Sequence, residues 1–209
     1  MKNILLIGDS IRAGYDKAVK SSLEGIANVY FPEENCRFAS YTLRYLHEYK
    51  ALLGENTADL IHWNAGLWDC LRLFGEDPQT PLDVYAYYIE RLCIRIKKLF
   101  PDAVVIFATS TRVQSEKMDP NFKRYNEDTE AYNAAAVEIV KKYGFQVNDL
   151  YAVSATLPEE AHSDAVHYYT PMGTEVFTNQ VLAYLAPALE LPEIPVYRED
   201  LYTDKPVGI

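Results

Sequence analysis

Two short motifs, near opposite ends of the sequence, combine a hydroxyl, an imidazole and two carboxylates. Gly8-Asp9-Ser10 forms the first motif, and Asp164 and His167 stand three residues apart in the second. A serine hydroxyl is a weak nucleophile until a neighbouring base accepts its proton. Within a turn, the spacing of Asp164 and His167 lets the carboxylate face one imidazole nitrogen and leaves the other for the hydroxyl. If the fold brings the motifs together, these side chains could perform acyl transfer.

Each motif also has a plain structural interpretation. The hydroxyl of Ser10 could cap a following helix, and His167 could be a loop histidine bonded to the backbone. His162 is also preceded by a glutamate at the same acidic-x-x-His spacing, and His162, Asp164 and His167 could together bind zinc or iron. Because no HExxH-like helical pair accompanies them, we expect no metal site.

A third segment, residues 64–69, offers hydrogen-bond donors. It reads NAGLWD and follows a short apolar run. Acyl transfer needs donors aimed at the developing oxyanion, typically backbone N–H groups and an asparagine side chain. Asn64 and Gly66 stand where such donors would be useful. Alternatively, Asn64 fixes a turn and Trp68 packs over it.

A fourth segment, residues 34–37, reads ENCR and also follows an apolar run. It could supply the backbone N–H of Cys36 together with a neighbouring asparagine or arginine side chain. Cys36 as a nucleophile is the weaker alternative, because no acid–base partner lies near it in the sequence. An exposed capping segment is the structural alternative.

The elements that must position these motifs alternate along the chain. Short apolar runs predict strands at residues 3–7, 27–31, 59–63, 104–109 and 146–148. Apolar residues at three- and four-residue spacing predict helices over residues 14–24, 40–53, 82–100, 125–143 and 171–184. This alternation predicts an α/β fold with a parallel sheet covered by helices on both faces.

The predicted fold gives the four motifs a common location. In open parallel sheets, ligands bind outside the carboxyl ends of the strands. Three of the motifs directly follow predicted strands, and the fourth precedes the last predicted helix. Ser10 and His167, far apart in the sequence, are therefore expected at the same edge of the sheet.

Composition limits the partners and the cellular setting. A length of 209 residues suits one domain, and Pro192, Pro195 and Pro206 predict an irregular tail over 190–209. The net charge of −10 repels nucleic-acid phosphates and anionic membrane surfaces. The apolar start is too short for a signal peptide, and no run reaches the ~20 residues of a membrane span. With three widely spaced cysteines and no CxxC pair, we expect a cytoplasmic protein.

From Gly8 to about Ala183 the sequence resembles the SGNH hydrolases, also called the GDSL esterase and lipase family. The GDS motif after the first strand, the DAVH motif before the last helix and the α/β alternation carry this resemblance. It implies a three-layer α/β/α sandwich with a five-stranded parallel sheet, as in flavodoxin-like folds. It also implies that Ser10 is the nucleophile, His167 the general base, Asp164 the orienting acid and the Ser10 N–H an oxyanion donor.

At two positions the chain departs from the usual pattern of that family. Cys36 stands where a glycine usually supplies an oxyanion N–H, which a backbone N–H of any residue can replace. Trp68 stands where an asparagine usually donates, and Asn64, two residues before Gly66 on the same side of an extended segment, is the expected substitute. The segments GDSIRAGY, PEENCR, WNAGLWD and DAVHY match one subgroup closely. The residues expected at the substrate pocket are Asp9, Arg12, Tyr15, Asn35, Arg37, Gly66 and Trp68.

The resemblance implies a serine esterase that removes small acyl groups, acetyl first, from a carbohydrate or another polar alcohol. A thioesterase or acyltransferase of the same fold is an alternative. Another is a ligand-binding module that lost efficient catalysis, which the departures at Cys36 and Trp68 would favour. A nucleotide-binding protein is less compatible, because Asp9 in the first loop would repel phosphate. We expect a small-molecule ester as the partner and neither a metal nor a cofactor.

Overall fold

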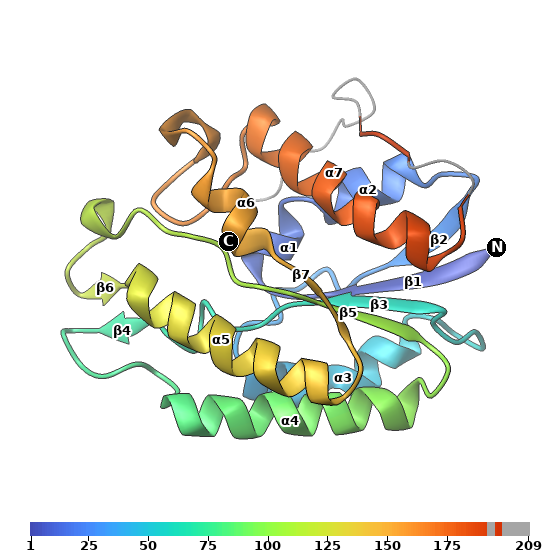
Figure 1. Cartoon of the computed structure of the whole chain (residues 1–209), viewed down its shortest axis with the longest axis horizontal. Coiled ribbons are helices and arrows are strands. Elements are labelled where there is room, and N and C mark those ends of the chain that lie inside the picture. Colours follow the sequence, from blue (N-terminus) through green and yellow to red (C-terminus); the bar gives the residue numbers. More distant parts are fainter. Residues whose placement is uncertain (192–194, 198–209) are drawn as a thin grey trace.

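A five-stranded parallel sheet forms the centre of the molecule (Figure 1). The computed structural model describes residues 1–191 and 195–197. The strands lie in the order β2-β1-β3-β5-β7. Their bounds are Lys2–Ile7 for β1, Ala27–Tyr30 for β2, Leu60–Trp63 for β3, Val104–Ala108 for β5 and Gln146–Asn148 for β7. A separate antiparallel pair joins β4 (Arg72–Leu73) to β6 (Phe122–Lys123).

Helices cover both faces of this sheet, as Figure 1 shows. One face carries α3 (Ala39–Ala51), α4 (Leu82–Leu99) and α5 (Asn126–Lys142), and the other carries α2 (Asp16–Ser22) and α7 (Pro171–Ala188). Two short helices, α1 (Ser10–Ala13) and α6 (Leu150–Ala155), directly follow β1 and β7, and 3₁₀ turns span Ser115–Lys117 and Glu159–Ala161. The predicted three-layer α/β/α architecture is confirmed.

The strands are apolar along their length because helices bury them from both sides. Ile4 to Ile7 of β1 are at most 1% exposed, and every residue of β3 is buried. Trp63 of β3 packs edge-on against Phe107 of β5, with ring centroids 4.9 Å apart. Burial lowers the pKa of His62 in β3 to about 3, so this imidazole stays neutral inside the sheet.

The strand order reverses at β1, because the next two strands of the sheet lie on opposite sides of it. β2 pairs with one side of β1, and β3 pairs with the other. Ile7 of β1 lies opposite Trp63 of β3, so the residues that follow them, Gly8 and Asn64, emerge side by side. Such a switch point at the carboxyl edge is where open parallel sheets bind ligands.

The predicted and observed elements differ at short segments. All five predicted strands and four of the five predicted helices are present. The expectation of one helix over 14–24 is wrong, because α1 and α2 are separate and Tyr15 lies between them. β4, β6 and α6 were not predicted, since so few residues show no periodicity. Most of the tail predicted over 190–209 lies outside the described residues.

Across the described part of the chain, none of the helices combines the length and the apolar character that crossing a membrane requires.

Candidate active site

Ser10 stands where β1 ends and α1 begins. Asp9 is the N-cap of α1, and its carboxylate accepts a hydrogen bond from the N–H of Ile11 at 2.9 Å. Gly8 must precede it, because a Cβ atom there would lie 1.9 Å from Asn64 Oδ1. The hydroxyl of Ser10 is thus held at the carboxyl edge of the sheet, and the residue is 6% exposed.

Ser10, His167 and Asp164 form one hydrogen-bonded chain, although 157 positions separate the first two. Ser10 Oγ lies 2.8 Å from His167 Nε2, and His167 Nδ1 lies 2.7 Å from Asp164 Oδ2. The carboxylate therefore orients the imidazole, and the second ring nitrogen meets the hydroxyl. The structure brings together the two motifs that the sequence placed at one edge of the sheet.

Asp164 also organises the turn that carries His167. Its Oδ1 accepts hydrogen bonds from the N–H of Val166 at 2.7 Å and from the N–H of His167 at 2.8 Å. Partial burial acts to raise the pKa of Asp164, but these hydrogen bonds and the imidazole prevail and lower it. The carboxylate therefore stays ionised, and 53% of its side chain is exposed to solvent.

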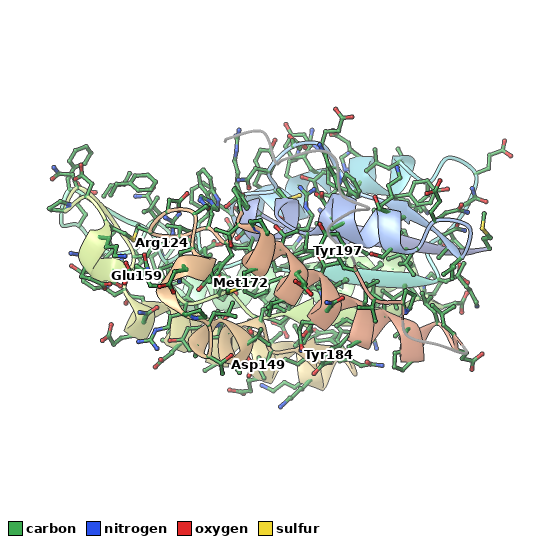
Figure 2. The ribbon with its side chains drawn as sticks, turned by 90° about the horizontal axis from the view of Figure 1, so that it is seen from above. Arg124, Asp149, Glu159, Met172, Tyr184 and Tyr197 are labelled. Atoms are coloured by element: carbon green, nitrogen blue, oxygen red, sulfur yellow. The ribbon has the colours of Figure 1, made fainter. Side chains whose placement is uncertain are left out.

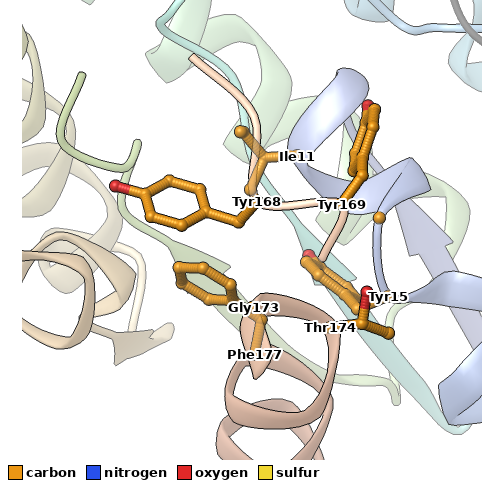
Figure 3. A pocket seen from close by; sticks show the side chains of 8 residues that line it. Ile11, Tyr15, Tyr168, Tyr169, Gly173, Thr174 and Phe177 are labelled. Carbon is orange, nitrogen blue, oxygen red and sulfur yellow. The ribbon is translucent and has the colours of Figure 1, made fainter. Parts of the chain in front are cut away.

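Tyr169, which the sequence reasoning did not single out, closes the site beside α7. Its hydroxyl donates to the carbonyl oxygen of Ser10 at 2.6 Å, and its ring stacks on His167 with centroids 4.8 Å apart. Beneath it lies a cavity of about 10 Å³, room for about one water molecule (Figure 3). The cavity is lined by Ile11, Gly14, Tyr15, Tyr168, Tyr169, Gly173, Thr174 and Phe177.

Asn64 follows β3 and is 2% exposed. Its Nδ2 donates to Asp9 Oδ1 at 2.9 Å, and its N–H donates to the carbonyl of Ile7 at 3.1 Å. An amide nitrogen carries two hydrogens, and the bond to Asp9 uses one of them. Asp9 is completely buried; it orients Asn64 and α1, and the expectation that it lines the substrate pocket is corrected.

The backbone of Cys36 does not provide the expected oxyanion donor. Its N–H donates to the carbonyl of Gly8 at 3.1 Å and is therefore occupied. The side chain is completely buried, and this burial raises the pKa of the thiol, which disfavours the nucleophilic thiolate. Cys36 instead ties the loop after β2 to the end of β1.

Arg12 and Tyr15 are also misplaced by the sequence reasoning, which put both at the substrate pocket. Arg12 is 1% exposed and pairs with the carboxylate of Asp16. Its guanidinium also donates to the carbonyl of Pro32 at 2.9 Å and to that of Glu34 at 2.6 Å. Tyr15 is 1% exposed and borders the small cavity beneath Tyr169. Both side chains are therefore buried inside the protein.

In the loop after β2, Asn35 and Arg37 take different roles. Asn35 is buried, and its Oδ1 accepts the N–H of Arg37 at 2.8 Å. This contact supports a positive φ of 49° at Arg37. The exposed guanidinium of Arg37 lies over the ring of Tyr41, 5.2 Å from its centroid. Of the two, Arg37 is the one that solvent can reach.

In the loop after β3, Gly66 sets the backbone conformation and Trp68 makes a ring contact. Gly66 has a φ of 150°, and a Cβ atom there would lie 2.6 Å from Ser110 Oγ, so other residues would be strained. Trp68 is partly buried and packs edge-on against Phe38 at 5.5 Å between centroids. Trp68 therefore joins the loops after β2 and β3.

Asp69, at the end of the same loop, caps α3 from outside the helix. Its Oδ2 accepts the N–H of Ala39 at 3.0 Å. The carboxyl group is completely buried, and burial raises its pKa to about 7. Ionisation of Asp69 at alkaline pH therefore lowers the stability of the folded protein.

This cost gives a pH-dependent prediction. Between pH ~4 and ~7, unfolded Asp69 has lost its proton while folded Asp69 keeps it, so the free energy of unfolding falls as pH rises. The shift corresponds to a loss on the order of 4 kcal/mol across this window. Asp69→Asn retains an acceptor for Ala39 without this titration. Urea unfolding at pH 4.5 to 8 should show that the stability of the variant rises relative to that of the wild type as pH rises. Parallel plots of the free energy of unfolding against pH would disprove the role of Asp69.

The alternative metal arrangement is not what the structure displays. Both nitrogens of His167 are engaged, one by Ser10 and the other by Asp164. His162 packs against the ring of Tyr168, with centroids 4.0 Å apart. Within the ranges that the structure describes, no three His, Cys, Asp or Glu side chains are grouped as metal ligands.

Comparisons with known proteins agree on the fold. No protein-family model matches the sequence, and no curated protein matches it. A lipase/acylhydrolase from Enterococcus faecalis is similar in structure, with a TM-score of 0.68, 19% identity and coverage of 90% of this chain and 96% of that chain. A GDSL-like lipase from Bacteroides thetaiotaomicron is also similar, with a TM-score of 0.67 and 15% identity, and the match covers 90% of this chain and 89% of that chain. An acetylxylan esterase from Geobacillus stearothermophilus has a TM-score of 0.64 and 17% identity, and the match covers 87% of this chain and 93% of that chain.

Proposed function

Since this chain has the fold of the SGNH hydrolases, we propose that it is a serine esterase that hydrolyses small acyl esters through an acyl-enzyme. One observation carries the proposal: Ser10 Oγ lies 2.8 Å from His167 Nε2, while Asp164 holds the opposite ring nitrogen. A hydroxyl, a base and an orienting carboxylate in this order are the parts that nucleophilic acyl transfer requires.

In the acylation step, His167 Nε2 accepts the hydroxyl proton as Ser10 Oγ attacks the ester carbonyl carbon. The C=O π bond opens, and the electron pair moves to the carbonyl oxygen. When the tetrahedral intermediate collapses, the bond to the alkoxy oxygen breaks, and the imidazolium returns its proton to the leaving alcohol. Asp164 stabilises the imidazolium through Nδ1. Water then repeats the sequence on the acyl-enzyme and releases the carboxylic acid and Ser10.

The developing oxyanion needs donors that are already in place. The N–H of Ser10 lies in the first turn of α1, where N–H groups lack acceptors within the helix. The second hydrogen of Asn64 Nδ2 is the other proposed donor, since the first is fixed by Asp9. With the N–H of Cys36 occupied, these two groups are proposed to form the oxyanion hole.

Short acyl groups suit the surroundings of Ser10. Tyr169 stacks on His167 and bonds to the Ser10 carbonyl, so the wall on this side is fixed. The cavity behind that wall has room for about one water molecule, so it offers no space for a long acyl tail. Acetylxylan esterases occur among the similar structures, which supports acetylated carbohydrates as the first substrates to examine.

A series of p-nitrophenyl esters tests this function. We expect acetate to be hydrolysed faster than butyrate, and octanoate to be the poorest substrate, because the wall at Tyr169 leaves no space for a long tail on that side of Ser10. Initial rates at equal concentrations give the ranking, and release of acetate from acetylated xylo-oligosaccharides tests the alcohol. Hydrolysis of octanoate at or above the rate of acetate would contradict the small-acyl assignment.

A ligand-binding module with weak catalysis is the second candidate. The occupied N–H of Cys36 favours it, because the site then lacks one of the donors that the resemblance implied. The two candidates differ in turnover. If an ester binds to the protein but is hydrolysed no faster than it is in buffer alone, the result would favour the binding module.

A further inference from the structure

A buried arginine that the mechanism does not use lies at the candidate site. Arg124 directly follows β6 and precedes α5, and it is 4% exposed. Figure 2 labels it at the same end of the molecule as Glu159. Its Nε donates to the carbonyl oxygen of Leu67, in the loop that begins at Asn64. The ring of Phe122 lies under the guanidinium, 5.4 Å from its carbon to the centroid. These two contacts fix the plane of the charged group.

The hydrogen bond to Leu67 joins this guanidinium to one loop of the candidate site. Leu67 belongs to the loop that follows β3 and carries Asn64. Burial lowers the pKa of Arg124, whereas Cys70, Asp9 and Asp164 act in the opposite direction. Asp9 precedes the nucleophile and Asp164 orients the base, so the charges that act on Arg124 are those of the candidate site.

Most of the donors of Arg124 are unused by the protein. A guanidinium has five N–H groups. Among the residues that the structure describes, the carbonyl of Leu67 is the one hydrogen-bond acceptor of Arg124. Neither neighbouring carboxylate forms a hydrogen bond with Arg124: Asp9 Oδ1 accepts from Ile11 and Asn64, and both oxygens of Asp164 accept from its own turn. Asp9 Oδ2 is buried without a hydrogen-bond partner.

An arginine held in this way is suited to an anionic ligand. Burying a charge is expensive unless it is paired, and here the remaining N–H groups have no acceptor on the described protein. Planar guanidinium edges bind carboxylates and phosphates through two parallel hydrogen bonds. The overall charge of −10 repels anions at long range, so an anion would be retained at a specific local cation rather than by the general field.

We propose that Arg124 is a specificity-determining residue that binds a carboxylate, or another anionic group, on the ester substrate. This inference rests on the proposed esterase function and names its substrate class: esters with a negative charge beside the scissile bond. The anion can belong to the acyl group or to the alcohol. The two sources share the same recognition chemistry and are separated by the test.

Two matched substrate pairs supply that test. p-Nitrophenyl hemisuccinate and p-nitrophenyl levulinate differ in a charge on the acyl side, and 3-acetoxybenzoate and 3-acetoxybenzamide differ in a charge on the alcohol side. With rates normalised to spontaneous hydrolysis, we expect the wild type to favour the anion in at least one pair by about tenfold or more in kcat/KM. Arg124→Gln should lower that ratio by about tenfold, and Arg124→Lys should lower it less, because lysine keeps the charge without the fork.

Arg112→Gln is the matched control, because Arg112 is an exposed arginine on the same segment and its loss should leave the ratio unchanged. A wild type without a preference for the anion in either pair overturns the inference, as does an unchanged ratio in Arg124→Gln. If Arg124→Gln does not fold by circular dichroism, the ratio in Arg124→Lys decides, and a ratio equal to that of the wild type overturns the inference. If all four esters react no faster with wild type than with Ser10→Ala, the esterase function itself fails.

Discussion

Replacement of Ser10 by alanine is expected to lower kcat/KM for p-nitrophenyl acetate by about 10⁴-fold or more. The variant lacks the oxygen that attacks the carbonyl, and His167 then has no hydroxyl at Nε2. Because Ser10 is 6% exposed and its replacement is slightly smaller, the fold should be preserved. Initial rates measured beside thermal unfolding would separate loss of chemistry from loss of structure.

The same variant supports a covalent test. A fluorophosphonate should add its phosphonyl group to wild-type Ser10, with fluoride as the leaving group and the hydroxyl proton taken by His167. The mass increase should be absent from Ser10→Ala and present in Ser21→Ala, a serine on α2 outside the site. Retained hydrolysis in Ser10→Ala, or labelling at another residue, would remove Ser10 from the nucleophilic role.

Replacement of Arg12 by methionine is expected to lower the free energy of unfolding by about 3–5 kcal/mol. The change leaves Asp16, whose side chain is 5% exposed, as a buried carboxylate without its cation. Burial already raises the pKa of Asp16, and Arg12 is the main opposing influence. The carbonyls of Pro32 and Glu34 also lose their donor. Urea unfolding monitored by fluorescence gives the free-energy difference.

Arg44→Met is the matched control for that measurement. Arg44 is 63% exposed and forms an ion pair with Glu48 at 3.1 Å within α3, a kind of pair that contributes less than about 1 kcal/mol. An equal decrease in the free energy of unfolding in the two variants would show that the buried contacts of Arg12 stabilise the fold no more than a surface ion pair does. The esterase rate should fall with Arg12→Met as well, because the loop that bonds to Gly8 loses its support.

The sequence predicted the layers and the meeting of the two motifs for the same physical reason. Strands buried on both faces must be continuously apolar, and the unbroken apolar run from Ile4 to Ile7 meets that requirement. With the sheet known to be parallel, the residue after such a strand must lie at its carboxyl edge. Ser10 and His167 could therefore be paired from their positions in the pattern, without any contact being visible in the sequence.

The direction of individual side chains could not be predicted in this way. Arg12 and Tyr15 follow Ser10 closely and were placed with it at the substrate pocket, but both are 1% exposed in the interior. Cys36 lies at the expected level of the sheet, yet its N–H is taken by Gly8. Hydrogen bonds between loops decide these orientations, and loop–loop contacts leave no periodic signal.

Tyr169 and Arg124 were missed for a related reason. Tyr169 stands two residues after His167 among several tyrosines, and composition could not distinguish it from a core ring. Arg124 reaches the site because β6 pairs with β4, and strands of two residues carry too little pattern to be recognised. Long-range pairing of short segments was the information that the sequence lacked.

The turn from Asp164 to His167 has a mechanical consequence. Its carboxylate is bonded to the backbone and to the ring of the same four-residue unit, so acid and base travel together as one rigid piece. The nucleophile belongs to a different piece, the end of β1. A small displacement of the turn would therefore lengthen the contact between the imidazole and the hydroxyl and inactivate Ser10, while the acid–base pair stayed assembled.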